Sequence, residues 1–368
     1  MFELPATLPR TGIGEEAALD QLGAAAMARA ADLAAPDVLA HMDPPSASVA
    51  AQMAYLVAQA NQNMLHPATS PFATLAEERV LEWIAPAFGM AWGQFCSGST
   101  LANLTALWAA REAGARTVVA SAEAHVSVPK AARILGMGYH PVPVGEDGRL
   151  IRSALPDLAA AALVLTAGTT GRGAIDELAP LAAKWLHVDA AWAGPLHLTA
   201  YAERLAGIEA ADSIAISAHK WFFQPKGAAL ALFRDIDAKA SITFTSSYLA
   251  RPNSGVEGTR SAAALPLLAT LLAWGRDGLA ERIERCMAIA EELAQRLEAD
   301  PRTVLRQWPE TGVLNWRPAA TDSAGVIAAL EGTSSAFTIG ETVWVRQVAA
   351  NPHAEVDAIW ARISAALG

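Results

Sequence analysis

The chain has 368 residues, of which 53% are hydrophobic and 17% charged, so it can form a large buried core. Its net charge of −10 and pI near 5.3 argue against a nucleic-acid partner, because a phosphate backbone needs a basic surface. No apolar run reaches the roughly 18–20 residues that span a bilayer, and the start MFELPATLPRTG lacks the features of a signal peptide. Together with two widely spaced cysteines, which form no metal motif, this predicts a cytoplasmic protein without a membrane partner.

The first two-thirds of the chain alternates predicted helices and strands. One or two alanine-rich helices are expected before the Asp43-Pro44-Pro45 turn, followed by helices at 47–60 and 77–88. Apolar runs of strand length then occur at 117–121, 162–167, 185–190, 213–217 and 227–233. Helical stretches separate most of them, for example at 127–136 and 177–184. This alternation predicts an α/β fold with a mostly parallel sheet covered by helices on both faces.

The pattern changes after about residue 260. A long helix is predicted over 276–299, followed by strand-like runs and two further helices, which is typical of a smaller α+β domain. We therefore predict an N-terminal helical segment at 1–60, a large α/β domain at 61–260 and a small C-terminal domain at 261–368. In such a sheet, a ligand is expected beyond the carboxyl ends of the strands.

An acid and a lysine follow two successive predicted strands. Asp189 ends the strand in HVDAAW, where a buried carboxylate needs a cationic partner such as a protonated pyridine nitrogen. Lys220 lies in SAHKW, where apolar neighbours favour the neutral, nucleophilic amine. Alone, Asp189 is compatible with a helix cap and Lys220 with a surface loop. Their joint placement favours a site for pyridoxal 5′-phosphate (PLP).

Three further motifs suit the same cofactor. In FCSGSTLAN, a helix opens at Ser99 and Thr100, whose hydroxyl and backbone N–H groups suit a phosphate, although both residue types are ordinary helix caps. His125, in AHVSVPK, suits stacking on a pyridine ring and proton transfer, or a plain loop position. Thr170, in AGTTG, offers a hydroxyl at a strand end or forms a simple turn. The missing GxxxxGK[ST] pattern disfavours a nucleotide P-loop.

Taken together, these motifs resemble the group II PLP-dependent amino acid decarboxylases, which act on aromatic amino acids, glutamate or diaminobutyrate. The resemblance runs in order from about His41 to the C-terminus, and HVDAAWAG and SAHKW at their spacing are its most specific parts. It implies PLP fold type I, which is aspartate-aminotransferase-like, with a mostly parallel central sheet and a smaller α+β C-terminal domain. It also implies a lyase of amino acid metabolism.

The resemblance assigns the cofactor ring to five residues. It implies that Lys220 forms a Schiff base with PLP and that Asp189 pairs with the pyridinium nitrogen. Ala191 and His125 would pack on the two faces of the ring. Thr170 would lie near the ring hydroxyl or the substrate.

The phosphate, the substrate and a second subunit are assigned in the same way. The resemblance implies that the phosphate is held by Ser99, Thr100, Ser217 and His219. Arg346 matches a family arginine and would bind a substrate carboxylate bidentately, with a structural ion pair as the alternative. The stretch 61–74, which includes His66, resembles a segment that reaches the active site partly across a dimer interface. A homodimer with shared active sites is therefore implied.

The chain also departs from this family in two respects. It is short, with a trimmed N-terminal region. In the family, a mobile loop after the lysine strand has a tyrosine that protonates the substrate carbon, whereas here the interval is compressed to 248–260. Its tyrosine, Tyr248, stands at the start and does not match the catalytic one. The proton donor is therefore left open by the sequence.

Decarboxylation of an L-amino acid to its amine is the first hypothesis. Because PLP labilises whichever bond is aligned with it, another carbon–carbon lyase of the aldehyde-lyase type, an aminotransferase or a desulfurase is the alternative. A non-catalytic PLP-binding protein is disfavoured by the intact Lys220, Asp189 and His125. A nicotinamide dehydrogenase is disfavoured because no GxGxxG follows a first strand. The sequence leaves the particular amino acid open.

Overall fold

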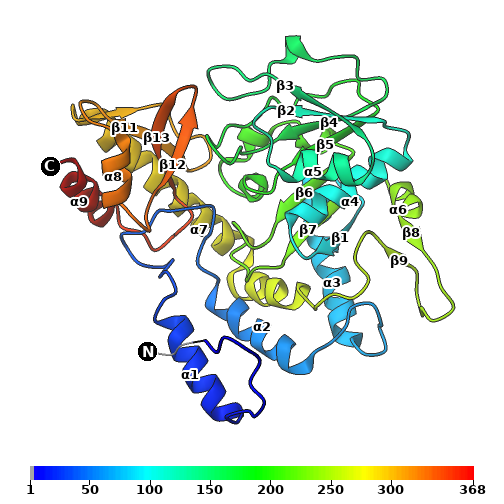
Figure 1. Ribbon diagram of the computed structural model, residues 1–368. Coiled ribbons are helices and arrows are strands. Elements are labelled where there is room, and N and C mark those ends of the chain that lie inside the picture. Colours follow the sequence, from blue (N-terminus) through cyan, green and yellow to red (C-terminus); the bar gives the residue numbers. More distant parts are fainter. Residues whose placement is uncertain (1–3) are drawn as a thin grey trace.

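The centre of the molecule is a seven-stranded sheet in the order β1-β7-β6-β5-β4-β2-β3 (Figure 1). The computed structural model describes residues 4–368, so residues 1–3 of the predicted N-terminal segment lie outside the described residues. β7 runs antiparallel to its neighbours β1 and β6, and the other neighbouring pairs are parallel. The strands are β1 (Trp92–Cys96), β2 (Thr117–Ser121), β3 (Gly138–Val142), β4 (Ala161–Thr166), β5 (Trp185–Asp189), β6 (Ser213–Ser217) and β7 (Ala229–Phe233). The predicted mostly parallel sheet is confirmed.

A second, antiparallel sheet forms in the C-terminal part, in the order β10-β11-β13-β12. Its strands are β10 (Thr303–Leu305), β11 (Val313–Pro318), β12 (Ser335–Ile339) and β13 (Thr342–Val348), and a short hairpin is formed by β8 (Thr243–Phe244) and β9 (Asn253–Ser254). The α-helices are α1 (Glu15–Met27), α2 (Ser48–Ala60), α3 (Pro71–Ile84), α4 (Ser99–Glu112), α5 (Ser127–Ile134), α6 (Asp237–Ser241), α7 (Ala264–Ala299), α8 (Ser323–Ala329) and α9 (Val356–Leu367). The 3₁₀-helices are η1 (Ala85–Phe88), η2 (Arg152–Ala154), η3 (Gly194–Leu198), η4 (Ala202–Leu205) and η5 (Ile208–Ala210).

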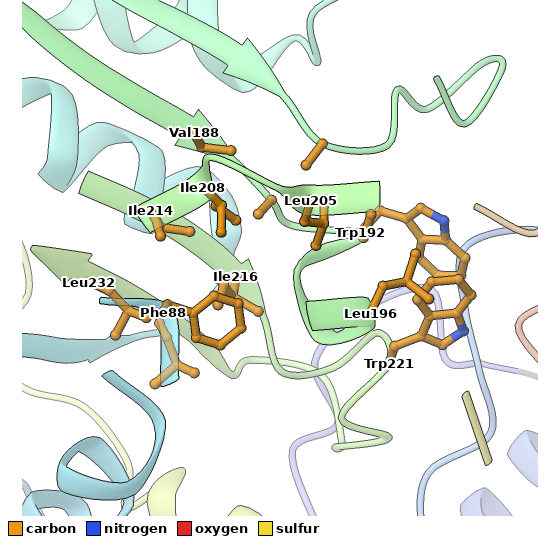
Figure 2. Packing of buried hydrophobic residues seen from close by; sticks show 14 of the residues in the cluster. Phe88, Val188, Trp192, Leu196, Leu205, Ile208, Ile214, Ile216, Trp221 and Leu232 are labelled. Carbon is orange, nitrogen blue, oxygen red and sulfur yellow. The ribbon is translucent and has the colours of Figure 1, made fainter. Parts of the chain in front are cut away.

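Alternate side chains of the central strands face two different cores. Val118 and Val164 point to one face, where they pack with the apolar sides of α4 and α5. Val188 and Ile214 point to the other face, together with Phe88 of η1, the 3₁₀-helices after β5 and part of α7 (Figure 2). Since successive residues of a strand point to opposite faces, continuous apolar strands are what a sheet covered on both sides requires.

Two tryptophans join the ends of β5 and β6. Trp192 follows Asp189 and Trp221 follows Lys220, and their ring centroids lie 4.1 Å apart (Figure 2). The indole Nε1 of Trp192 donates to the carbonyl of Thr311 at 2.8 Å. Both rings are fully buried. The two strand-end turns are therefore held against each other and against the C-terminal part of the chain.

The C-terminal sheet packs on the second part of α7. Leu293 and Leu297 of this helix form a core with Trp316 of β11 and Ile359 of α9. The helix is interrupted at Gly275, whose φ of 66° and ψ of −175° are not helical. In Figure 1 the helix extends from the bottom of the large sheet to the small one. The predicted domain limits 1–60, 61–260 and 261–368 are kept as a proposal.

The predicted helix at 177–184 is wrong, because this segment is irregular in the structure. Pro180 cannot donate a helical hydrogen bond and would clash with a carbonyl four residues earlier. The Arg152 guanidinium instead donates to the carbonyls of Glu177 and Ala179, both at 2.7 Å. The connection from β4 to β5 therefore crosses without a helix.

Within residues 4–42 the structure has one helix, α1, and none of its residues is buried. Leu19 and Leu22 of α1 are 74% and 54% exposed. In Figure 1, α1 projects from the lower edge of the molecule. Among residues 4–368, no helix is both long and apolar enough to cross a membrane.

Candidate active site

A cavity of about 320 Å³ lies beyond the carboxyl ends of β4, β5 and β6. This is the edge of a parallel sheet at which ligands are expected to bind. Register places Asp189 beside Thr166 of β4 and Ala215 of β6. The cavity is lined by Ser97, Gly98, Ser99, Thr100, Leu101, His125, Thr166, Gly168, Thr170, Asp189, Ala191, Trp192, His219 and Lys220. A larger cavity of about 610 Å³, between α2 and the turn after Lys220, has neither Asp189 nor Lys220 in its wall.

Asp189 is held by two donors at the floor of the cavity. Its Oδ2 accepts a hydrogen bond from Asn103 Nδ2 at 2.9 Å, and its Oδ1 accepts one from the backbone N–H of Ala191 at 3.1 Å. The residue is 4% exposed. A carboxylate buried to this extent suits a cationic ring nitrogen as its partner.

Lys220 lies in the turn that follows β6. Burial lowers the pKa of its amine, and the nearby Asp189 carboxylate acts in the opposite direction. Lowering the pKa increases the neutral fraction of the amine, which is the form that attacks an aldehyde. Lys220 and Asp189 line the same cavity, as their positions at neighbouring strand ends predicted.

The first turn of α4 forms one end of the cavity. We call it, with Ser97 and Gly98 before it, the phosphate-type turn, because its groups suit a phosphate. Ser99 and Thr100 begin the helix, and geometry leaves the backbone N–H groups at a helix start without intrahelical acceptors. Gly98 before them has a φ of 144°, which L-residues rarely adopt, and a side chain there would meet open space. The Ser217 hydroxyl is buried without a hydrogen-bond partner. A helix N-terminus with an open approach and an unused hydroxyl fits a phosphate group.

Of the other residues predicted to contact the cofactor ring or its phosphate, most line this cavity and one does not. Ala191, Thr170, His125 and His219 line it, whereas Ser217 lies just outside the lining. His219 Nδ1 donates to the carbonyl of Ala228 at 3.1 Å, and burial lowers the His219 pKa. Burial likewise lowers the pKa of His125. Neutral imidazoles at both positions are therefore favoured near neutral pH.

The two predicted substrate residues are outside the cavity lining. Arg346 on β13 is buried, and its Nε donates to the carbonyl of Thr170 at 2.8 Å. Burial lowers its pKa to about 10, and none of the ion pairs among residues 4–368 includes it. His66 is half-buried in the loop between α2 and α3, where its carbonyl accepts from the Ser70 hydroxyl at 3.0 Å.

Several residues at the site were not identified from the sequence, and Asn103, Thr166 and Trp192 are examples. Asn103 contacts Asp189 from the second turn of α4, the buried Thr166 hydroxyl has no partner, and Trp192 forms part of the cavity wall. The motifs FCSGSTLAN and HVDAAW contain two of them, but neither motif indicates which side chains face the ligand.

The compressed interval 248–260 contains most of the loop and the second strand of the β8–β9 hairpin. Phe244 stacks on Trp108 of α4 with ring centroids 5.7 Å apart. Tyr248 at the hairpin loop is 71% exposed and is absent from the cavity lining. Glu257 after the hairpin accepts a hydrogen bond from the backbone N–H of Ser97 at 2.8 Å. The segment that follows the hairpin thus contacts the turn before α4, whereas Tyr248 is absent from the cavity lining.

Residues 27–317 match the family model of the pyridoxal-dependent decarboxylase conserved domain. An L-2,4-diaminobutyrate decarboxylase of Rhizobium meliloti is 37% identical over 334 residues, which cover 78% of this chain and 67% of that protein. An aspartate 1-decarboxylase of Aliivibrio fischeri is 28% identical over 359 residues, covering 80% of this chain and 66% of that protein. The chain thus spans about two-thirds of the length of these relatives.

Solved structures share the fold. Mouse CSAD has a TM-score of 0.87 at 22% identity, with 98% of this chain and 89% of that chain covered. Oryza sativa TDC with PLP and tryptamine has a TM-score of 0.88 at 21% identity, with 99% and 90% covered. The predicted fold type I architecture is confirmed. The family match extends over most of the chain and includes the motifs that contain Asp189 and Lys220. The chain therefore belongs to the pyridoxal-dependent decarboxylase family and is a PLP-dependent amino acid decarboxylase.

Proposed function

We propose that the protein decarboxylates a small polar L-amino acid, with Lys220, Asp189 and His125 as its catalytic residues. The observation that carries this proposal is the buried Lys220 amine and the buried Asp189 carboxylate in one cavity. The same cavity ends at the N-terminus of α4, so its groups suit an aldehyde, a ring nitrogen and a phosphate.

Each residue around the cavity is proposed to contact a different part of the cofactor. Lys220 provides the amine for the cofactor aldehyde, and the Asp189 carboxylate holds a proton on the ring nitrogen. Ala191 and His125 pack against the two ring faces, and Thr170 lies near the ring hydroxyl or the substrate. The phosphate is held by Ser99, Thr100, Ser217 and His219. Support comes from the cavity lining and from the unused Ser217 hydroxyl.

When bound, PLP takes up the electron pair that remains when the substrate Cα–carboxylate bond breaks. Asp189 favours this by keeping the ring nitrogen protonated, and burial strengthens that interaction because the local dielectric is low. A proton must then reach Cα. Lys220 and His125 are the cavity-lining side chains suited to deliver it, since Tyr248 is absent from the lining.

The substrate class follows from the space and from the relatives. A cavity of about 320 Å³ is at the small end of ligand pockets and has to accept the cofactor as well. The Rhizobium meliloti and Aliivibrio fischeri relatives are named for L-2,4-diaminobutyrate and aspartate, which both have four carbons. We therefore propose a four-carbon polar substrate rather than an aromatic one.

Arg346 and His66 complete the proposed substrate side. Arg346 is buried without an acidic partner among the described residues, and it lowers the pKa of Lys220, which indicates that it lies near the site. A guanidinium in this state gains most from a substrate carboxylate. His66 is proposed to reach the site of a second subunit.

The proposed assembly is a cytoplasmic homodimer with shared active sites. Apolar side chains of the N-terminal half are exposed on α1, α2 and α3, including Leu19, Leu22, Leu56 and Phe72. Exposed apolar side chains on several helices favour a protein interface. The buried free thiols of Cys96 and Cys286 agree with a reducing compartment.

The decisive experiment is CO₂ release by PLP-loaded protein from L-2,4-diaminobutyrate, L-aspartate, L-glutamate, L-tyrosine and L-tryptophan. Release from a four-carbon substrate is expected, with loss of release and of the visible cofactor absorbance in Lys220→Ala. Lys184→Ala, an exposed lysine, is the matched control. Release from an aromatic substrate alone would contradict the substrate class, and full release by Lys220→Ala would contradict the role of this lysine.

A further inference from the structure

Asn103 lies at the centre of a buried chain of hydrogen bonds beneath the cavity. Its Nδ2 is 2.9 Å from Asp189 Oδ2 and 2.9 Å from Ser127 Oγ, and its Oδ1 is 3.0 Å from His187 Nε2. Ser127 Oγ is in turn 2.8 Å from His125 Nδ1. One amide therefore contacts the partner of the cofactor nitrogen directly and the ring-stacking histidine through a single hydroxyl.

The far end of the chain is consistent with one direction of these hydrogen bonds. The indole Nε1 of Trp185 can only donate, and it lies 2.8 Å from Ser213 Oγ. The Ser213 hydroxyl accepts this bond and can donate its own proton to His187 Nδ1 at 2.8 Å. His187 then has its proton on Nε2 and donates to Asn103 Oδ1. This orients the Asn103 amide with both N–H bonds toward Asp189 and Ser127.

The opposite orientation of the amide is disfavoured by charge. A proton on His187 Nδ1 could be accepted by the Ser213 carbonyl, 3.1 Å away, or by the second lone pair of the Ser213 hydroxyl, 2.8 Å away. Asn103 would then have to turn its NH₂ to His187 and its oxygen to Asp189 Oδ2, with two acceptors 2.9 Å apart. That contact is repulsive unless the carboxyl is protonated, which is incompatible with a carboxylate that pairs with a ring cation.

We propose that Asn103, oriented by neutral His187, is a positioning residue that fixes the Asp189 carboxylate and, through Ser127, the tautomer of His125. The Ser127 hydroxyl, which accepts from Asn103, donates to His125 Nδ1, and the proton of neutral His125 stays on Nε2. Asp189, at the edge of the cofactor ring, and His125, on its face, are thus both held by Asn103. The inference rests on the proposed roles of Asp189 and His125.

Burial makes this anchor energetically important. Asn103, His187, Ser127 and Ser213 are each at most 1% exposed, so an unmatched donor or acceptor has no water to replace its partner. Burial lowers the pKa of His187 to about 4, and Asp189 is the charged group that faces it. The charged groups that face His125 are Asp189, Lys220 and Lys130.

The first test replaces Asn103 by leucine, which has a similar shape and no donors. PLP affinity, measured by titrating apo-protein and following cofactor absorbance, is expected to fall roughly ten- to a hundredfold, as for the loss of hydrogen bonds to a charged group. The pH titration of the bound-cofactor absorbance is expected to shift. Gln347→Leu is the control, because Gln347 accepts from Trp316 Nε1 at 2.9 Å in another buried network.

The control separates positioning from stability. Both leucine variants are expected to lower the melting temperature of the apo-protein, while only Asn103→Leu changes PLP affinity and the absorbance titration. Equal PLP affinity and an unchanged titration in Asn103→Leu would overturn the proposal. Wild-type protein that fails to bind PLP at all would instead refute the proposed function, so the two failures are distinguishable.

A second test leaves Asn103 in place and applies even if its leucine variant does not fold. In His187→Gln, the amide nitrogen can replace Nε2 as the donor to Asn103, so PLP affinity is expected to stay within about threefold of wild type. His187→Leu lacks this donor and is expected to bind roughly tenfold more weakly. Equal affinities in the two variants would show that His187 only fills space.

The tautomers can be observed directly by ¹⁵N NMR of histidine-labelled protein, with assignment through the His187→Gln variant. A neutral His187 protonated on Nε2 at pH 7 is expected. A proton on Nδ1 would overturn the orientation of Asn103 and with it the proposal.

Discussion

Burial lowers the pKa of Lys220, while the Asp189 carboxylate on the neighbouring strand end acts against this shift. The amine and the acid were both predicted from their motifs, because an apolar strand that ends in a charged residue is recognisable in a sequence. Asn103 was not predicted, since its role depends on a helix and two strands that meet only in the folded protein. The sequence therefore located the buried lysine and carboxylate of the cavity, and the fold was needed to find the amide that contacts this carboxylate.

Asp189→Asn tests the charge of the carboxylate without changing its shape. The neutral amide cannot hold a proton on the cofactor ring nitrogen, so we expect kcat to fall by at least about a hundredfold while PLP still binds. CO₂ release and cofactor absorbance measure the two quantities separately. A variant with wild-type kcat would exclude Asp189 as the partner of the ring nitrogen.

His187 predicts a pH dependence of stability. Burial lowers its folded pKa to about 4, below the ordinary histidine value of 6.5, so the unfolded chain binds a proton more readily. This contribution to stability is complete above pH 6.5 and is lost as the pH falls from 6.5 toward 4. From pH 7.5 to pH 5, the loss is about 2 kcal/mol.

Urea unfolding of wild type and His187→Gln at these two pH values measures the effect. The glutamine variant is expected to lose about 2 kcal/mol less than wild type over the interval, since it has no group to titrate there. An equal loss in both proteins would exclude a neutral, buried His187.

At the scale of elements, apolar periodicity located the central strands well and the edges poorly. β2 and β6 coincide with the predicted runs 117–121 and 213–217, because both are buried on two faces. β1 and β3 were missed, since one contains Gly93 and Gln94 and the other is an exposed edge strand with Pro141. The helix at 177–184 was predicted wrongly from the composition of this segment. The prediction gave too little weight to Pro180.

The break in α7 gives a prediction for this scale. Gly275 has φ 66° and ψ −175°, and a Cβ there would meet no atom within 4 Å, so the cost of Gly275→Ala is conformational. We expect a destabilisation of about 1–3 kcal/mol. Gly325→Ala in α8 also meets no atom but needs no unusual φ, and we expect it to stabilise by about 0.5–1 kcal/mol. Urea unfolding compares them, and equal stabilisation would show that α7 does not need its break.

At the scale of the whole molecule, the exposed apolar side chains of α1 have no counterpart within one chain. The helix has no buried residue, although Leu19, Leu22 and Met27 are large and apolar. A surface of this kind favours a second subunit as its cover.

The double variant Leu19→Glu/Leu22→Glu tests this interface. We expect wild-type protein to sediment at twice the chain mass of 38.5 kDa, and the variant to dissociate at concentrations at which wild type stays dimeric. Asp20→Asn on the same helix is the control and should sediment like wild type. A dimer of unchanged strength in the double variant would exclude α1 from the interface.

The position of β7 in the large sheet has a consequence for biosynthesis. β1, which leads into the phosphate-type turn, pairs only with β7 in the sheet, and Cys96 at its end lies opposite Ala229. A ribosome that adds about 5–20 residues per second needs on the order of ten seconds to make the chain between these partners. During that interval β1, which leads into α4, has no partner strand in the sheet. The edge of the sheet that leads into α4 is therefore completed only after β7 has emerged and inserted between β1 and β6.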